Sequence, residues 1–179
     1  MKTALIVYSS NTGNTAKVAF AIEEGLKAAG IMVTVKKPEE AKNLDYFDYD
    51  LVCVGSPSLQ WHPAKPMDDF LKTKLATYRQ QGKIMAGAPK VAGKYALVFC
   101  TYSGPHTGID EATPAGKYMR QFFEHIGFTI LDEWYVLAEF HGNLENSTKG
   151  RMGDIRGKPT GQDLLKIKKD AEAAAAKLV

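Results

Sequence analysis

Five apolar segments rich in β-branched and aromatic residues alternate with segments of helical periodicity. The apolar segments read TALIVYS, IMVTV, YDLVCVG, YALVFCT and TILDEWYVLAEF, at residues 3–9, 31–35, 49–55, 95–101 and 129–140. The first, third and fourth are almost continuously apolar, which is typical of strands buried on both faces of a parallel sheet. The pattern therefore predicts five buried strands.

Four other segments place apolar residues at helical spacing, and they cover residues 14–29, 64–81, 114–126 and 160–179. Gly30 is expected to end the first of these helices. Thr113 is expected to be the N-cap of the third, with Pro114 at its first helical position. Thr160 and Asp163 have the spacing of a capping box at the start of the last helix.

Strands that alternate with helices predict an α/β fold, a doubly wound parallel sheet with helices on both faces. The length of 179 residues and the absence of internal repeats or linker-like composition predict one domain, residues 1–179. A polar segment with four glycines, residues 141–159, is longer than loops in compact domains usually are. We expect it to be either functional or mobile.

The composition narrows the class of protein. The net charge is +3, and its basic residues are scattered rather than gathered in a stripe, which argues against nucleic-acid binding. Cys53 and Cys100 lie inside apolar segments, so we expect buried reduced thiols and no metal site. No apolar stretch approaches the ~18 residues of a membrane span, and the start of the chain does not resemble a secretory signal. These features predict a cytoplasmic protein without membrane insertion.

A polar segment without cationic residues joins the first strand to the first helix. It contains Ser9, Ser10, Asn11, Thr12, Gly13, Asn14 and Thr15. A helix N-terminus offers unpaired backbone N–H groups and the positive end of the helix dipole, the hydroxyls add donors, and Gly13 allows close approach. The segment predicts a site for a phosphate monoester. The alternative is a polar turn that only caps the helix.

The sequence argues against phosphoryl transfer. That reaction requires a cation at the transferred group, as in the motif G-x-x-x-x-G-K-[ST]. The stretch GAPKVAGK has one residue too many between its glycines and is followed by tyrosine, and G-x-G-x-x-G does not occur. Neutral donors are suited to a phosphate that stays bound.

The segment Ser10–Thr15, SNTGNT, resembles the phosphate signature of the flavodoxin family, (S/T)-x-T-G-x-T, and it has the same place after the first strand. The resemblance covers nearly the whole chain, because two further loops follow strands where flavodoxins have them. It implies a flavodoxin-like five-stranded parallel sheet of order 2-1-3-4-5. It also implies non-covalent FMN, bound at the switch between the first and third strands as in flavodoxins.

The resemblance implies that the isoalloxazine lies between two loops. In the loop after the third strand, residues 56–62, Trp61 with Leu59 and Pro57 could form a wall against the ring, and Ser56 and Ser58 could donate hydrogen bonds. The alternative for Trp61 is a partly buried anchor between sheet and helix.

The second loop that the resemblance places against the isoalloxazine follows the fourth strand, at residues 101–108. Tyr102 could stack on the opposite ring face, while Thr101, Ser103 and Gly104 could contact the pyrimidine edge. His106 could donate a proton near the flavin. The alternatives are an ordinary aromatic residue at a strand end and a turn histidine without a redox role.

Two departures from the family pattern bear on function. Flavodoxins are typically acidic and carry acidic residues in the last of these loops, whereas this chain has none there before Asp110. We expect a neutral or cationic rim, and with it a less negative second reduction potential. In the segment 141–159, Arg151 and Arg156 could pair with an anionic group such as the phosphate of a nicotinamide cofactor, and the same is considered for His141. The alternative is a solvated loop.

Two functions remain open. The first is an FMN-binding electron-transfer protein that serves redox partner proteins and has no catalytic residues of its own. The second is an NAD(P)H-dependent FMN or quinone oxidoreductase with a small quinone or nicotinamide substrate. A response-regulator receiver domain is excluded, because the positions that would hold its acidic residues are Ser9, Ser10 and Gly55. The oligomeric state is left open.

Overall fold

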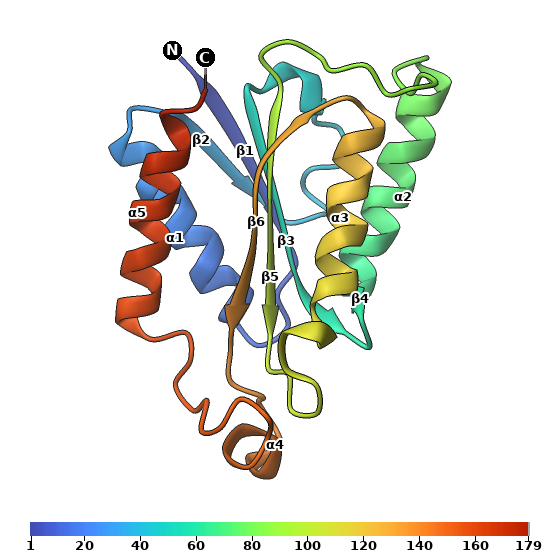
Figure 1. Cartoon of the computed structure of the whole chain (residues 1–179). Helices are drawn as coiled ribbons and strands as arrows, with labels where there is room; N and C mark the ends of the chain where they lie inside the picture. Colours follow the sequence, from blue (N-terminus) through green and yellow to red (C-terminus); the bar gives the residue numbers. More distant parts are fainter. Residues whose placement is uncertain (179) are drawn as a thin grey trace.

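A computed structural model describes residues 1–178. Its parallel sheet has the order β2-β1-β3-β5-β6 (Figure 1). The strands are β1 (Thr3–Tyr8), β2 (Met32–Lys36), β3 (Leu51–Leu59), β5 (Tyr95–Tyr102) and β6 (Thr129–Leu137). A short strand, β4 (His62–Pro63), pairs antiparallel with the end of β3. Because β4 lies off the main path, the predicted order of the five parallel strands is confirmed.

Helices cover both faces of the sheet, as predicted. On one face lie α1 (Asn14–Ala28) and α5 (Gly161–Ala175), and on the other lie α2 (Lys65–Gln80) and α3 (Thr113–His125) (Figure 1). Short helical turns are η1 (Tyr46–Asp48), η2 (Gly108–Glu111) and α4 (Leu144–Thr148).

The central strand β1 shows why both faces need cover. Leu5 and Val7 belong to the apolar core that includes α2 and α3 side chains, whereas Ala4 and Ile6 belong to the core that includes α1 and α5 side chains. All four are fully buried. Successive side chains of a strand point to opposite faces. Because both faces of β1 are buried, each of these four positions is apolar, and the segment is uninterrupted.

The helix ends agree in part with the sequence. The capping box of Thr160 and Asp163 is present, and α1 ends at its C-cap Ala29, directly before Gly30. The prediction for Thr113 is wrong. The N-cap of α3 is Ala112, and the Thr113 hydroxyl instead donates to the carbonyl of Ile109, because η2 leads directly into the helix. Pro114 lies in the first turn.

The end of β3 differs from the prediction. The strand continues past residue 55 to Leu59, and it turns back through Gln60 and Trp61 into β4. Both turn residues have positive φ angles, 49° and 69°. Two-residue hairpin turns of this kind usually carry Asn or Gly, so the residue types at these positions do not indicate a hairpin.

The segment 141–159 is ordered by contacts rather than free in solution. Ser147, in α4, is buried, and its carbonyl accepts from the N–H of Ile155. The N–H of Arg151 donates to the carbonyl of Pro105 in the loop after β5. The segment thus packs against that loop.

Two smaller predictions concern thiols and membranes. Cys53 and Cys100 are both buried and free, as predicted, and burial raises the pKa of Cys100 to about 12. Within residues 1–178, no helix combines the length and the apolarity that crossing a membrane requires.

Candidate cofactor-binding site

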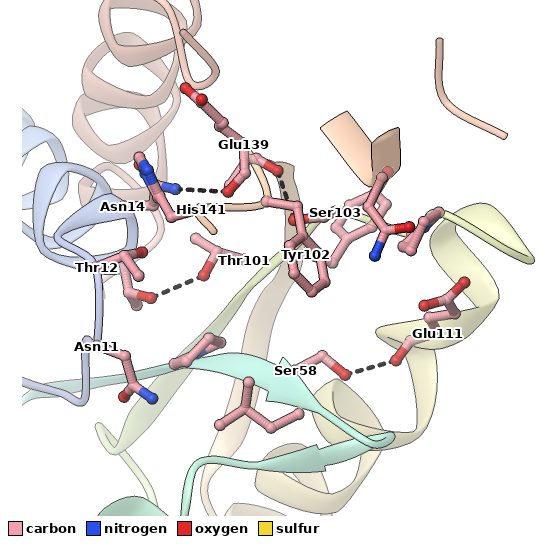
Figure 2. Close-up of a pocket in the computed structure, with 18 of the residues that line it drawn as sticks. Asn11, Thr12, Asn14, Ser58, Thr101, Tyr102, Ser103, Glu111, Glu139 and His141 are labelled. Atoms are coloured by element: carbon pink, nitrogen blue, oxygen red, sulfur yellow. Dashed lines mark hydrogen bonds between the residues drawn. The ribbon is translucent and has the colours of Figure 1, made fainter. Parts of the chain in front are cut away.

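A cavity of about 420 Å³ opens at the carboxyl ends of the strands. Four chain segments line it: the start of α1, the β3–β4 hairpin, the loop after β5 and the segment after β6 (Figure 2). In an open parallel sheet this edge, where the strand order reverses, is where ligands bind. The cavity therefore brings together the three loops that the sequence singled out.

The start of α1 presents unpartnered backbone donors to this edge. The Ser10 hydroxyl accepts from the N–H groups of Gly13 (3.2 Å) and Ala16 (3.3 Å). Across the described part of the chain, no acceptor is found for the N–H groups of Asn14 and Thr15. Gly13, the N-cap, has a φ of 94°, a left-handed conformation that glycine adopts without strain.

Two buried side chains of α1 fix this turn to the sheet. The Asn14 amide donates to the carbonyl of Glu139 over 3.2 Å, and the hydroxyls of Thr15 and Thr101 hydrogen-bond to each other over 2.7 Å (Figure 2). Thr12 is exposed and has no hydrogen-bond partner among residues 1–178. The hydroxyls of Thr12 and of the Thr15–Thr101 pair therefore retain donor or acceptor capacity for a ligand.

The β3–β4 hairpin forms one wall. Trp61 lines the cavity and is 60% exposed, so the prediction of a cavity wall fits better than the alternative of a buried anchor. The Ser58 hydroxyl donates to the carbonyl of Glu111 over 2.5 Å, which ties the hairpin to η2. The positive φ angles of Gln60 and Trp61 make this a strained turn, and such strain gathers at functional sites.

The loop after β5 forms the opposite wall. Tyr102 lines the cavity and is only 8% exposed, and burial raises the pKa of its phenol. The Ser103 hydroxyl donates to the carbonyl of Ala138 over 2.8 Å (Figure 2). Gly104 has a φ of 55°, and a Cβ there would lie 2.5 Å from the carbonyl oxygen of Gly108, so a larger residue would displace the loop.

Acidic side chains also reach the cavity. A carboxylate oxygen of Glu111 accepts from the N–H groups of His106 and Thr107, both over 2.7 Å. Glu139 lines the cavity too, and its carboxylate accepts from the N–H of Gly157. The expected neutral or cationic rim is therefore wrong, because two carboxylates accompany the lining histidines His106 and His141.

The predicted site residues fall into two groups. Those that line the cavity are Asn11, Thr12, Asn14, Thr15, Pro57, Ser58, Leu59, Trp61, Thr101, Tyr102, Ser103, Gly104 and His106. Those that do not are Ser9, Ser10, Gly13 and Ser56. Ser56 is buried, and its hydroxyl accepts from the N–H of Ala64 and donates to the carbonyl of Pro57, so it shapes the hairpin from behind.

Sequence reasoning missed several lining residues, namely Gln60, Pro105, Glu111, Ala138, Glu139, Phe140 and Asn146. Ala138, Glu139 and Phe140 directly follow β6, and the assignment of residues 129–140 to one strand hid them. Ligands bind at the carboxyl ends of parallel strands. A predicted strand that ended at Leu137 would therefore have placed these three residues at the site.

The two arginines considered for an anionic group do not line the cavity. Arg156 pairs with Asp154 over 2.6 Å, and this ion pair lowers the pKa of Asp154 to about 2. The Arg151 side chain lies against Gly108, behind the loop that carries His106. Residues 1–178 contain no cluster of three or more His, Cys, Asp or Glu side chains suited to a metal ion.

A doubly wound parallel sheet with a polar helix start and aromatic side chains at its switch point is the arrangement in which α/β proteins commonly bind nucleotide cofactors. Residues 5–127 match a family model described as a flavodoxin domain. The chain belongs to the flavodoxin family.

Known proteins similar to this chain carry two different names. An NAD(P)H dehydrogenase (quinone) of Rhizobium rhizogenes is 30% identical over 165 residues, which cover 81% of this chain and 77% of that protein. A flavodoxin of Aquifex aeolicus is 28% identical over 145 residues, which cover 78% and 70%. The solved structure of a flavodoxin from the domain Archaea superposes with a TM-score of 0.69 at 22% identity, over 98% of each chain, and shows the fold.

Proposed function

We propose that the protein binds FMN non-covalently in this cavity and works as an electron-transfer protein. The Ser10–Thr15 loop holds the phosphate, and the isoalloxazine lies between the 56–62 and 101–108 loops. Bound FMN supplies the redox chemistry, since flavins take up and release one or two electrons. The partners are redox proteins that approach the open side of the cavity.

One observation carries this proposal. The same cavity is lined by unpartnered N–H groups at the start of α1 and by the aromatic side chains of Trp61 and Tyr102. The N–H groups of Asn14 and Thr15 suit a dianionic phosphate at the positive end of the helix. Tyr102 and Trp61 suit a planar ring system. The residues present therefore fit both ends of FMN.

The side chains have separate tasks in this account. Ser10, which does not line the cavity, holds the loop in shape, because its hydroxyl accepts from the N–H groups of Gly13 and Ala16. Tyr102 excludes water from one ring face, because it is buried at the end of β5. Ser58 and Ser103 fix the two walls through their bonds to backbone carbonyls.

A second candidate function is an NAD(P)H-dependent FMN or quinone oxidoreductase. The similarity to the protein of Rhizobium rhizogenes favours it. The exposure of Trp61 also favours this function. The indole ring is carried by the two-residue turn between β3 and β4, and this position leaves the hairpin side of the cavity open to a small substrate. Hydride transfer requires such an open face, whereas outer-sphere electron transfer requires only an exposed edge.

An anaerobic reductive titration of the FMN-loaded protein, followed by its visible spectrum, distinguishes the two functions. Electron transfer predicts that a one-electron-reduced form accumulates, and that NADPH and NADH reduce the protein slowly. Rapid reduction by either nucleotide, with direct bleaching and turnover of a quinone, would instead establish the oxidoreductase. A protein that stays colourless with FMN would contradict both.

A further inference from the structure

A second cavity, of about 300 Å³, lies between α2 and the segment that follows β2. It shares no lining residue with the first cavity. Pro38, Pro66 and Phe70 give it apolar walls, and its charged lining residues are Lys42, Lys74, Glu39 and Asp69. No part of the proposed electron-transfer function uses this site.

Lys74 is the unusual residue here, because its side chain is almost wholly buried. The residue is 6% exposed, and its ammonium donates to the carbonyls of Lys42 (2.8 Å) and Leu44 (2.5 Å). It also lies 5.7 Å from the ring centres of Tyr46 and Phe70. In the part of the chain that the structure describes, no carboxylate lies within ion-pair distance of it.

An ammonium in this position has capacity left for a ligand. It carries three N–H donors, and two of them are used by the backbone carbonyls. Burial of this charge is costly and lowers the pKa of Lys74, although the carboxylate of Asp45 acts in the opposite direction without forming an ion pair with it. An anion in the cavity would accept from the third N–H and balance the charge.

The other polar groups of the cavity are already engaged or lie at its edge. The hydroxyls of Thr73 and Thr77 donate to helix carbonyls. The carboxylate of Asp69 pairs with Lys65, and Glu39 is exposed to solvent. Spare donors are therefore few, which disfavours an inorganic phosphate with its many acceptor oxygens. The apolar walls favour a ligand with an apolar body.

We propose that this second cavity binds a small organic monocarboxylate, whose carboxylate accepts a hydrogen bond from the Lys74 ammonium while its apolar body packs against Pro38, Pro66 and Phe70. At the edge, the exposed Lys42 offsets the charge of Glu39, and Asp69 is paired with Lys65. The cavity thus serves as a ligand site beside α2 that shares no lining residue with the first cavity.

The test is an NMR titration of the full chain with benzoate, with benzamide as the neutral isostere and inorganic phosphate as an anion without an apolar body. We expect saturable shifts at Pro38–Lys42 and along α2 with benzoate, and binding at least about tenfold weaker for the other two probes. Equal binding of benzoate and benzamide, or shifts elsewhere in the molecule, would overturn the proposal.

Two variants sharpen the test. Lys74→Met keeps the length of the side chain and removes the charge, and it should weaken benzoate binding at least about tenfold while leaving FMN affinity unchanged. Lys72→Met, on the exposed face of the same helix and paired with Asp68, is the matched control and should bind benzoate normally. Unchanged binding to Lys74→Met would contradict the proposal.

A readout on the unmodified chain covers the case in which Lys74→Met does not fold. Titration of the lysine side chains by NMR should show that saturating benzoate raises the pKa of Lys74, because the carboxylate stabilises the charged ammonium. A Lys74 pKa that is the same with and without benzoate would overturn the proposal.

Discussion

Thr12 and Thr15 both belong to the phosphate signature, but their side chains differ in burial and in hydrogen bonding. Thr12 is exposed with a free hydroxyl, whereas Thr15 is buried and bonded to Thr101. We predict that Thr12→Val together with Thr15→Val lowers FMN affinity, because each lost hydrogen bond to a charged group is worth about 1.5–3 kcal/mol. Fluorescence titration with FMN measures the loss.

A control separates binding from folding in that experiment. Thr73→Val removes an exposed hydroxyl on α2, far along the chain from the signature, and should leave FMN affinity unchanged. The free energy of unfolding of each variant without FMN shows how much of the effect arises from the broken Thr15–Thr101 bond. FMN affinity unaltered in the double variant would refute the assignment of the phosphate site.

Trp61 permits a second test at single-residue resolution. It is one of two tryptophans in the chain, and the other, Trp134, lies on β6 away from the cavity lining. We predict that Trp61→Ala weakens FMN binding by about 1–3 kcal/mol, the range for stacking of a planar ring on an aromatic side chain. The stability of the FMN-free protein should change little, because the ring is mostly exposed.

Tryptophan fluorescence provides the measurement. In the unmodified protein, FMN should quench the emission of Trp61, and the Trp134→Phe variant should retain this quenching. The prediction fails if Trp61→Ala binds FMN as tightly as the unmodified chain.

At the scale of elements, α1 and α5 pack so closely that one position excludes any side chain. A Cβ at Gly25 would lie 2.1 Å from the carbonyl oxygen of Lys168 and 2.8 Å from the Cβ of Ala171. We predict that Gly25→Ala destabilises the protein by about 1–3 kcal/mol, although alanine is the better helix former. Urea denaturation measures the change.

The matched control lies on the partner helix. Gly161, the first residue of α5, has no heavy atom within 4 Å of a built Cβ and a negative φ. Gly161→Ala should therefore be neutral or stabilising by up to about 1 kcal/mol. Equal effects of the two substitutions would show that the helix contact is looser than described.

The elements also show what the sequence could not reveal. Continuous apolar segments predicted the presence of β1, β3 and β5, because burial on both faces leaves a strong pattern, although they missed the end of β3. The hairpin of Gln60 and Trp61 has no such pattern, since its turn residues adopt left-handed conformations that their types disfavour. Glu111 reaches the cavity only through the tertiary arrangement of η2.

For the molecule as a whole, carboxylates that pair in the folded state predict its acid sensitivity. Burial alone would raise the pKa of Asp45, but hydrogen bonds from Lys83, the Phe47 N–H and Tyr78 hold it below its ordinary value of 3.8. A lowered folded-state pKa contributes stability above the unfolded value, and that contribution is lost as the pH falls through the folded value. Stability should therefore decline below about pH 4.

Urea denaturation at pH 7, 5 and 3 checks this prediction. Asp45→Asn should be less stable than the unmodified protein at pH 7, and the difference should shrink as the pH falls below the unfolded value of 3.8, because protonation of Asp45 in the unfolded chain then removes the stability that its charged form contributes. Asp48→Asn, at an exposed carboxylate of the same η1 turn, is the control and should cost little at any pH. A constant penalty for Asp45→Asn would contradict the role of its charge.

Fold and site were not equally predictable over the whole molecule. The phosphate signature is local, so Ser10–Thr15 carried the family resemblance and included four residues that line the cavity, namely Asn11, Thr12, Asn14 and Thr15. Ser56 shares the polarity of Ser58, yet it is buried behind the hairpin, and no local pattern distinguishes the two. Side chains that meet only when the sheet closes require the tertiary structure.

The most direct test of the account compares FMN with riboflavin, which lacks the phosphate. Fluorescence titration of the FMN-free chain should give one bound FMN per chain, and riboflavin should bind much more weakly, because it leaves the donors at the start of α1 unpartnered. Equal affinity for the two flavins, or no binding of either, would contradict the assignment of this cavity as a flavin site with its phosphate at Ser10–Thr15.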